Sequence, residues 1–250
     1  MKIAIITGAS RGLGKTAALH AAQRGIGVIA TYNSNAAEAA QVVAEIEKLG
    51  GKAVAIKLDA TKSASFAEFA SEVQKNLKQK WAAEKFDFLV NNAGFGLYAP
   101  IEATTEEQFD QLMAVHLKGP FFLTQKLLPL MNDKGRIINL STGLTRFSFP
   151  GYGAYAMMKG GVEVFTRYLA KELGARGITV NTLAPGAIET DFGGGGVRDN
   201  PEVNKMIASL TNLGRAGVPD DIGPLIASLL SEDARWVNAQ RIEASGGMLS

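Results

Sequence analysis

The feature that most restricts the fold of this sequence is a regular alternation of short apolar segments with longer segments of helical periodicity. Most apolar segments are continuous rather than alternating, which is typical of strands buried on both faces. They cover residues 3–7, 26–31, 53–58, 86–90, 136–140, 178–183 and 241–243. The helical patterns lie between them, up to residue 24 and at 35–49, 65–80, 105–131, 152–175, 200–212 and 219–231. This order predicts an α/β fold, a doubly wound parallel sheet with helices on both faces.

Length and composition favour one domain. The 250 residues contain no repeat, linker or change in composition, so we expect a single domain over residues 1–250. Hydrophobic residues make up 46% of the chain, which is enough to fill a sizeable core. Four consecutive glycines at 193–196 have no side chains to pack. They predict a mobile loop within a lid over residues 187–217.

Several classes of protein are disfavoured by the same counts. The formal net charge is only +2 and no basic block stands out, so we expect no nucleic acid and no membrane surface as partner. There is no cysteine, and His20 and His116 lack a zinc-binding spacing, so we expect no metal. The first apolar segment is too short for a signal peptide, and no apolar run reaches about 18 residues. We therefore expect a cytoplasmic protein.

A glycine-rich turn follows the first apolar segment. Gly8, Gly12 and Gly14 lie between a predicted strand and a predicted helix, where backbone N–H groups and the helix dipole can bind a diphosphate. Their spacing is Gly-x3-Gly-x-Gly, not the commoner Gly-x-Gly-x2-Gly. Further polar residues and turns follow other predicted strands, at Asp59, Asn91, Ser141, Thr142 and Pro185-Gly186. Because ligands of such sheets bind beyond the carboxyl ends of the strands, we expect the functional site at this edge.

The predicted helix at 152–175 carries a candidate acid/base pair. Tyr155 and Lys159 are four residues apart, so they share one face of the helix. A free phenol has a pKa of about 10, and a nearby ammonium lowers that pKa by favouring the phenolate. The pair is therefore interpreted as an acid/base for a carbonyl or alcohol oxygen. The alternative interpretation is a surface helix that carries both residues by chance.

Five motifs follow one another along the chain. They are Thr7-Gly8-x3-Gly12-x-Gly14, Asn91-Asn92-Ala93-Gly94, a hydroxyl residue thirteen positions before Tyr155, Tyr155-x3-Lys159 and Pro185-Gly186. In this order they resemble the short-chain dehydrogenase/reductase family, and the resemblance extends from Lys2 to the Ser245-Gly246-Gly247 end. The resemblance implies a Rossmann fold, a nicotinamide cofactor and hydride transfer to a carbonyl.

The resemblance also implies roles for single residues. Tyr155 would be the acid/base, while Lys159 would bind the nicotinamide ribose and lower the pKa of the phenol. The adenosine end would be held by Asp59, Ala60 and the segment 91–94. The full set of cofactor-binding candidates is Gly8, Ser10, Arg11, Gly12, Leu13, Gly14, Thr31, Asn33, Ser34, Asp59, Ala60, Asn91, Ala93, Gly94, Tyr155, Lys159, Pro185, Gly186, Ile188 and Thr190. Purely structural alternatives stay open, because Asn91, Asp59 and Pro185-Gly186 would also suit a strand end or a turn.

Two candidate catalytic positions depart from the family pattern. The usual serine is replaced by Thr142, whose hydroxyl can still donate to a developing alkoxide but whose methyl group narrows the pocket. Ser141 is the second candidate donor, although alternation along a strand predicts that it points away. The family's helix asparagine, thought to hold a proton-relaying water, is replaced by His116. An imidazole at this position would relay protons, titrate itself or simply pack in the helix.

The choice of cofactor depends on the end of the second predicted strand. Sites that prefer NAD place an acidic residue there to bind the ribose 2′-hydroxyl. This chain has Ala30-Thr31-Tyr32-Asn33-Ser34, and its first acidic residue is Glu38. Arg11 in the glycine-rich turn can instead form a charge-assisted fork with a 2′-phosphate. We therefore expect NADP (NADPH), with a solvated loop arginine as the alternative.

Together these observations predict an NADP-dependent oxidoreductase that reversibly reduces a ketone or aldehyde carbonyl, with tyrosine as proton donor. A 3-oxoacyl-carrier-protein reductase is one alternative, and a nucleotide-binding sensor without catalysis is another. Candidate walls of an apolar substrate pocket are Phe95, Leu97, Phe147, Phe149, Tyr152 and Phe192. The resemblance further implies a homotetramer built on the helices near 105–131 and 152–175 and on the C-terminus.

Overall fold

The computed structural model describes all 250 residues and contains one seven-stranded sheet whose strands all pair in parallel. The strands are β1 (Ile3–Ile6), β2 (Gly27–Tyr32), β3 (Ala53–Lys57), β4 (Phe86–Asn91), β5 (Met131–Leu140), β6 (Thr179–Pro185) and β7 (Arg241–Ala244). Their order across the sheet is β3-β2-β1-β4-β5-β6-β7. The direction of winding reverses between β1 and β4, which confirms the doubly wound α/β fold.

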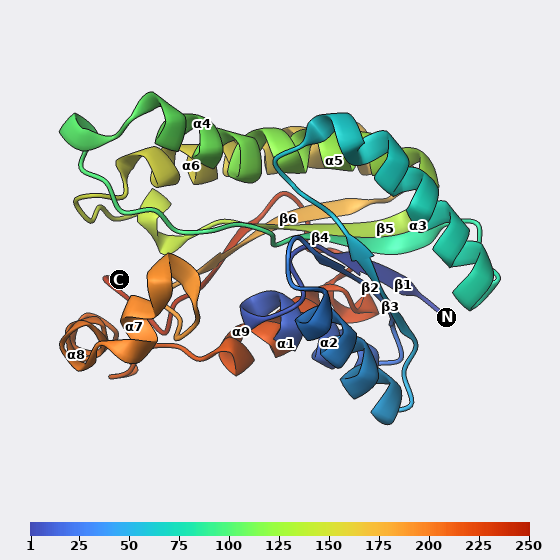
Figure 1. Ribbon diagram of the computed structural model, residues 1–250, viewed down its shortest axis with the longest axis horizontal. Helices are drawn as coiled ribbons and strands as arrows, with labels where there is room; N and C mark the ends of the chain where they lie inside the picture. The colour runs from blue at the N-terminus through green and yellow to red at the C-terminus, as the bar shows by residue number, and fades with distance from the viewer.

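Helices cover both faces of this sheet (Figure 1). One face packs against α1 (Gly12–Gln23), α2 (Ala36–Lys48) and α9 (Pro219–Leu229). The other packs against α3 (Phe66–Trp81), α5 (Gly119–Leu127) and α6 (Gly153–Leu173), and α4 (Glu106–Met113) leads into α5. The short helices α7 (Gly196–Asp199) and α8 (Pro201–Ser209) lie at the same end of the molecule as the C-terminus (Figure 1).

The two apolar layers explain why the strands are apolar throughout. In β2, Val28 belongs to the layer under α1 and α9, whereas Ile29 belongs to the layer under α3 and α6. Both residues are completely buried, because successive strand residues point to opposite faces and both faces are covered. Burying each such side chain contributes roughly 1.5–3 kcal/mol to stability. A polar residue at either position would therefore weaken one layer.

The long helix expected at 105–131 is interrupted in the structure. A π-helical turn over Ala114–Lys118 joins α4 to α5, and a 3-10 turn over Leu128–Leu130 follows α5. Pro120 has no N–H group to donate to the preceding turn, which accounts for the irregular hydrogen bonding before it. Strand β5 consequently begins at Met131, five residues earlier than its apolar pattern predicts. The chain nevertheless remains helical across Gly119-Pro120.

The tetraglycine segment bends the chain before α7. Residues Phe192–Gly195 form a short turn with a kink at Gly193 and Gly194, and this turn leads directly into α7. Gly193, Gly194 and Gly195 have φ angles of +63°, +77° and +80°, in the left-handed region that side chains disfavour. Three glycines in succession are therefore needed for the backbone to take this path.

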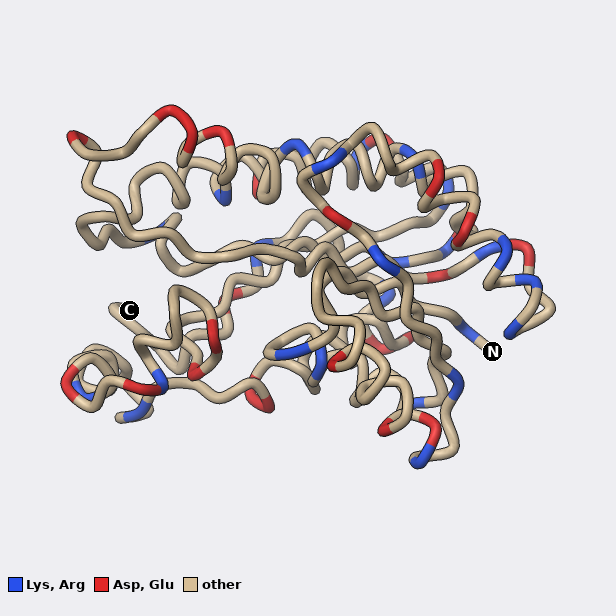
Figure 2. Tube along the Cα trace, in the orientation of Figure 1, with Lys and Arg blue, Asp and Glu red and all other residues tan.

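Charged side chains are distributed over the outside of the molecule. In Figure 2, lysine and arginine positions are interspersed with aspartate and glutamate positions along the outer helices. None of the helices combines the length and apolarity that a membrane span requires.

Candidate active site

The glycine-rich turn connects β1 to α1 and leaves room for an anion. Gly8 and Gly12 have φ angles of +63° and +55°. A side chain at Gly14 would come within 2.3 Å of the carbonyl oxygen of Gly8. Arg11 caps α1 without a side-chain hydrogen bond, and the first turn of α1 has no acidic residue. Unpaired N–H groups at a helix N-terminus bind phosphate, so this turn fits the diphosphate of a dinucleotide.

The turn is fixed from β2 and from the segment after β4. Thr31 Oγ1 accepts a hydrogen bond from Gly8 N at 3.2 Å, and Thr31 O accepts one from Ala9 N at 2.8 Å. Thr31 is buried, so its hydroxyl supports the turn rather than a ribose. Asn92 Nδ2 donates to Thr7 O at 2.8 Å and to Gly8 O at 3.1 Å. Sequence reasoning gave Asn92 no separate role, although it lies within the quoted 91–94 motif.

Asn91 lies in the interior of the sheet. Its Nδ2 donates to Asn139 Oδ1 at 2.8 Å and to Thr124 Oγ1 at 3.1 Å. These bonds join β4 to β5 and α5, as expected for a residue that stabilises the central sheet. Ala93 N and Asn92 N both donate to the hydroxyl of Thr7, so the segment after β4 is tied to the end of β1.

The remaining cofactor candidates lie around the same edge. Thr190 lies against the glycine-rich turn, since a side chain at Gly12 would come within 3.7 Å of its methyl group. Gly186 N donates to Ala244 O at 3.1 Å, which joins the end of β6 to β7. Asp59 accepts from Thr61 N and Thr61 Oγ1, so this carboxylate already closes a turn after β3. Other candidates occupy the turn and α1 (Ser10, Leu13), the exposed end of β2 (Asn33, Ser34) and the segments after β3, β4 and β6 (Ala60, Gly94, Pro185, Ile188).

Arg11 extends from the turn into solvent. Its side chain is 65% exposed, and its Nη1 lies 3.5 Å from Asp191 Oδ2. Asp191 also pairs with Arg198 of α7. Asp191 is therefore the carboxylate partner of Arg11, and Asn33 and Ser34 at the end of β2 supply no further one.

Helix α6 places the acid/base pair against β5. Tyr155 and Lys159 are each only 5% exposed, and Lys159 Nζ donates to Leu140 O at 2.8 Å. The Nζ atom lies 5.8 Å from the centre of the phenol ring. These positions bring the predicted pair together on the buried face of the helix.

The expected lowering of the phenol pKa is contradicted by the structure. Burial raises the pKa of Tyr155 well above its ordinary value, and the nearby hydroxyl of Thr142 offsets only part of that effect. Burial also lowers the pKa of Lys159 to about 7. Desolvation is therefore the largest influence on the phenol pKa.

Thr142 is the second residue beyond the end of β5 and has an extended conformation. Its Oγ1 accepts a hydrogen bond from Leu144 N at 3.3 Å, and its hydroxyl lowers the pKa of the nearby phenol of Tyr155. Ser141 is not available as the second candidate donor, because its Oγ donates to Glu163 Oε1 at 2.7 Å. The alternation of side chains along the strand separates the two hydroxyls.

His116 lies in the π-helical turn and is 1% exposed. Its Nε2 lies 2.8 Å from Phe95 O, and since a carbonyl only accepts, Nε2 carries the proton. Nδ1 is buried and has no partner. Burial, and next the positive charge of Lys159, hold the pKa of His116 well below its usual range. His116 is therefore neutral near pH 7, which rules out the expectation that it titrates there.

Sequence reasoning missed two charged residues beside this site. Glu163 lies eight residues after Tyr155 on the same face of α6, and Arg241 begins β7. Arg241 Nε donates to Glu163 Oε1 at 2.8 Å, and Arg241 Nη2 donates to Thr142 O at 3.1 Å. The spacing of Tyr155, Lys159 and Glu163, four residues each, is a signal that could have identified Glu163. No local signal pointed to Arg241.

The aromatic candidates form two groups around Tyr155. Phe95, Leu97 and Tyr152 pack against the cluster of Tyr155, Leu112 and Met158. Phe147 and Phe149 instead pack with α8 and Met248 near the C-terminus.

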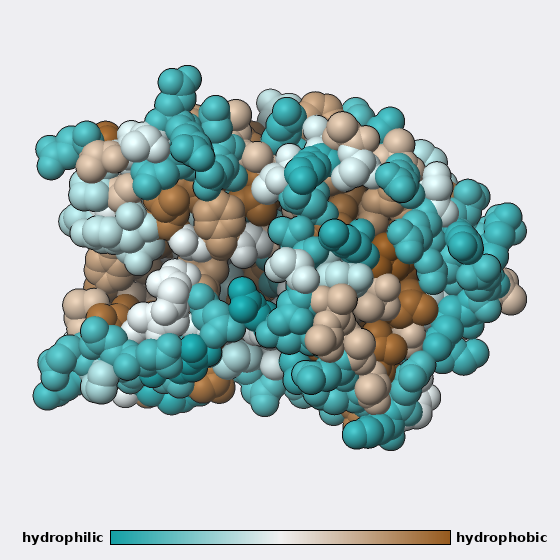
Figure 3. Space-filling model, viewed as in Figure 1, coloured by the Kyte–Doolittle hydropathy of each residue, from teal (hydrophilic) through white to brown (hydrophobic).

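Phe192 reaches over from the segment before α7. Its ring centroid lies 5.6 Å from that of Tyr155. In Figure 3, brown and tan side chains gather in the hollow between the α4 side and the α7–α8 side of the molecule. The space in front of the phenol is thus bordered by aromatic side chains from three segments.

Comparison with known proteins gives matches over almost the whole chain. Residues 8–249 match the sequence profile described as Enoyl-(Acyl carrier protein) reductase. The hydroxynaphthalene reductase-like protein Arp2 of Metarhizium brunneum (strain ARSEF 3297) is 36% identical over 260 residues, covering 100% of this chain and 95% of Arp2. The angucycline C-6 ketoreductase LanV, solved with bound NADP, superposes with a TM-score of 0.94 at 39% identity, covering 99% and 95%. A short-chain dehydrogenase/reductase from Serratia marcescens BCRC 10948 gives 0.91 at 30% identity, covering 100% and 98%.

Proposed function

This chain belongs to the short-chain dehydrogenase/reductase family, and we propose that it reduces a ketone carried on a fused aromatic skeleton, using NADPH. Its reaction class is NADP-dependent carbonyl reduction. One observation supports the residue assignment above all others. The hydroxyl of Thr142 lies near enough to the phenol of Tyr155 to lower its pKa, beyond the end of β5 and on the same sheet edge as the glycine-rich turn.

The two hydroxyls perform the oxygen chemistry in this proposal. Thr142 Oγ1 and Tyr155 Oη both donate to the substrate oxygen, which stabilises negative charge as it develops there. Because burial raises the pKa of Tyr155, the phenol stays protonated at neutral pH and is ready to act as an acid. NADPH, when bound, supplies the hydride to the carbonyl carbon. Tyr155 transfers its proton to the oxygen, which gives the alcohol.

Lys159 and His116 restore the proton in the proposal. Lys159 Nζ, anchored on Leu140 O, is the nearest cation to the phenol. The bare Nδ1 of His116 is an acceptor for a water molecule that also contacts Lys159. His116 thereby takes over the role that the resemblance gives to an asparagine, as an acceptor and without becoming charged.

The residues of the cofactor edge favour NADPH. The glycine-rich turn has the open N–H groups that a diphosphate needs. Arg11 is exposed beside it, and the end of β2 carries Asn33 and Ser34 rather than an acidic residue. Thr190 lies against Gly12, where it can contact the cofactor from the lid side. LanV, the relative of 39% identity, was solved with bound NADP.

The aromatic border of the site favours a flat substrate. Phe95, Tyr152 and Phe192 present ring faces and edges near Tyr155, and Tyr98 stacks edge-on against Tyr152 at 5.6 Å. Aromatic pairs of this geometry are favourable. A fused ring system bound here would therefore gain binding energy from aromatic contacts on three sides. The two relatives named above, a hydroxynaphthalene reductase-like protein and an angucycline ketoreductase, support the same class of substrate.

The deciding experiment is a substrate panel. NADPH oxidation is measured with tetralones, decalones, simple aliphatic ketones, aldehydes, and free and carrier-bound 3-oxoacyl thioesters, with Tyr155→Phe as the inactive control. We expect fused bicyclic ketones to give the highest kcat/KM. A strong preference for carrier-bound thioesters would favour a 3-oxoacyl-carrier-protein reductase. NADPH binding without turnover of any carbonyl would favour a sensor.

We further propose that copies of the chain associate through α5 and α6. These helices expose large apolar side chains to solvent, namely Phe121, Phe122, Met157, Val164 and Tyr168. Several large apolar side chains exposed on two neighbouring helices favour a protein interface there. A homotetramer needs a second surface, and Trp236 near the start of β7 is 95% exposed.

A further inference from the structure

The backbone that carries Thr142 is held by a network of charges on both sides. Glu163 Oε1 accepts hydrogen bonds from Ser141 Oγ and Thr145 Oγ1, each at 2.7 Å. The residue before Thr142 and the third residue after it are therefore fixed to one carboxylate oxygen. Arg241 Nη2 fixes the carbonyl of Thr142 itself at 3.1 Å.

The network connects three separate parts of the chain. Glu163 comes from α6, Arg241 from β7 and Thr142 from the end of β5. Arg241 is bound to Glu163 through Nε at 2.8 Å and to Glu243 through Nη1 at 2.7 Å. The side chains of Glu163 and Arg241 are 14% and 25% exposed, so solvent screens this ion pair only in part.

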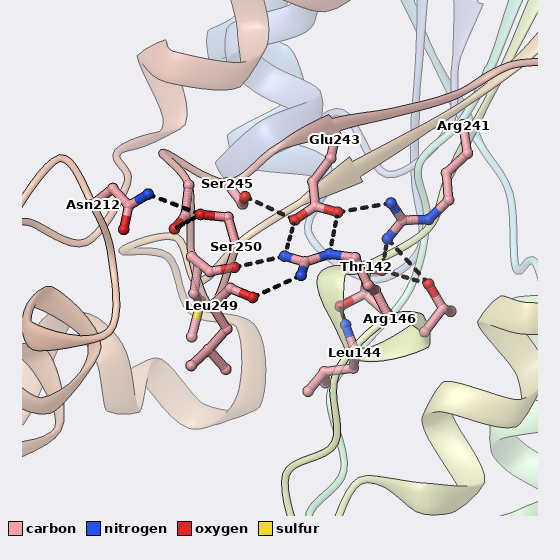
Figure 4. A network of polar contacts seen from close by, with 12 residues as sticks. Thr142, Leu144, Arg146, Asn212, Arg241, Glu243, Ser245, Leu249 and Ser250 are labelled. Atoms are coloured by element: carbon pink, nitrogen blue, oxygen red, sulfur yellow. Dashed lines mark hydrogen bonds and ion pairs between the residues drawn. The ribbon is translucent and has the colours of Figure 1, made fainter.

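The far side of the network reaches the C-terminus (Figure 4). Glu243 accepts two hydrogen bonds from Arg146, at 2.7 and 2.9 Å, in the forked arrangement that guanidinium favours. Arg146 also donates to the carbonyl oxygens of Met248 and Leu249. These bonds hold β7 and the last residues of the chain against the turn that follows Thr142.

From this arrangement we propose that Glu163 and Arg241 are positioning residues for the Thr142 hydroxyl. Glu163 is about two helical turns from Tyr155 on the same helix. Its hydrogen bonds therefore hold the backbone around Thr142 at a fixed position relative to α6. Arg241 prevents that backbone from rotating by holding the carbonyl of Thr142. Glu163 and Arg241 thereby fix the distance between the hydroxyls of Thr142 and Tyr155, which donate to the substrate oxygen. The inference rests on the proposed function.

The first experiment compares two arginines that each hold backbone carbonyls. Arg176 is the matched control, because it pairs with Asp133 and donates to Leu128 O and Met131 O at the opposite end of β5. Arg241→Met should lower kcat about ten- to hundredfold, as small misplacements of catalytic groups do, with the dissociation constant of NADPH unchanged within about twofold. Arg176→Met should leave kcat unchanged. Equal losses in both variants would overturn the proposal, since they would reflect general destabilisation.

A double-mutant cycle tests whether Arg241 acts through Thr142. In a Thr142→Val background the hydroxyl is gone, so adding Arg241→Met should change kcat by less than about twofold. If the second substitution costs the same factor as in the wild type, Arg241 does not position Thr142. Glu163→Gln keeps an oxygen that accepts from Ser141 and Thr145, so it should retain more activity than Glu163→Leu. Identical losses would contradict the role of that oxygen.

Hydrogen exchange separates this inference from the proposed function. Amide exchange in residues 141–147 should become faster in Arg241→Met and in Glu163→Leu, and should be unchanged in Arg176→Met, in protein without cofactor or substrate. Unchanged exchange in Arg241→Met would refute the positioning role of Arg241, whatever substrate the enzyme reduces. If exchange becomes faster as expected but the wild type reduces no ketone, the positioning role is supported and the proposed function is refuted.

Discussion

The imidazole of His116 meets the phenol ring of Tyr155 edge to face, with ring centroids 5.0 Å apart and ring planes at 82°. This contact places a neutral, fully buried base directly beside the proposed proton donor. It arises from the π turn that precedes Pro120, which puts His116 on the inner side of the helix. Irregular helical turns of this kind often occur at functional sites.

His116→Asn and His116→Phe separate the chemistry of the imidazole from its packing. Asparagine retains an acceptor and a donor, so we expect kcat within about fivefold of the wild type. Phenylalanine retains the ring contact but loses both nitrogens, and kcat should fall about tenfold or more if Nδ1 relays protons. The measurement is NADPH-dependent ketone reduction across pH. Full activity in His116→Phe would leave Nδ1 without a catalytic role.

The hydroxyl of Thr142 should matter far more than its methyl group. Thr142→Val removes the hydroxyl with little change of shape and should lower kcat about 100- to 1000-fold, as loss of an oxyanion donor does. Thr142→Ser keeps the donor and should hold kcat within about threefold, with a lower KM for bulky ketones because the pocket widens. Steady-state kinetics on one fused bicyclic ketone and one small ketone decide this. A Val variant as active as the Ser variant would exclude Thr142 as the oxygen-binding group.

Lys159 predicts an unusual dependence of stability on pH. Its pKa is lowered from 10.5 to about 7 in the folded protein, so between these values the unfolded chain binds more protons. Stability should therefore rise with pH from about 7 to 10, by about 1.4 kcal/mol per pH unit at most. Lys159→Met removes the buried charge, so it should be more stable than the wild type at pH 7, and this advantage should shrink toward pH 10. Urea unfolding without cofactor, with Lys171→Met as the exposed control on α6, measures the difference. A gap that stays constant with pH would show that Lys159 is not buried as a titrating group.

Arg11 should determine the preference between NADPH and NADH. Arg11→Glu removes a charge-assisted contact to a 2′-phosphate and adds repulsion, so the KM for NADPH should rise about tenfold to hundredfold. NADH should be affected little, and the preference should reverse. Asp191→Asn frees Arg11 from its carboxylate partner and should leave NADPH affinity equal or tighter. If Arg11→Glu changes the KM values for NADPH and NADH by the same factor, Arg11 does not recognise the 2′-phosphate.

The exposed apolar face of α5 and α6 should control assembly. Tyr168→Glu places a charge on that face, where Tyr168 is 68% exposed, and should lower the mass measured by light scattering after gel filtration. Leu49→Glu, at a 54% exposed position beyond α2, is the control and should leave the mass unchanged. A monomeric wild type would refute the proposed interface outright.

Much of the fold was determined by the sequence alone. Each buried strand is marked by an apolar run because helices cover both of its faces, as Val28 and Ile29 illustrate. Parallel strands bring their carboxyl ends to one edge, so the glycine-rich turn, Thr142 and Tyr155-x3-Lys159 had to meet once the alternation of strand and helix was recognised. These signals are local, so they can be recognised in the amino-acid sequence alone.

Only the tertiary structure decided the chemical state of the site. The pKa of Tyr155 rises and that of Lys159 falls because the folded chain removes both from water, an effect that no spacing of residues encodes. The proton of His116 is placed on Nε2 by the carbonyl of Phe95, and Arg241 meets Glu163 although 78 residues separate them. Desolvation and long-range hydrogen bonds depend on which distant segments pack together. That packing exists only after the sheet has formed.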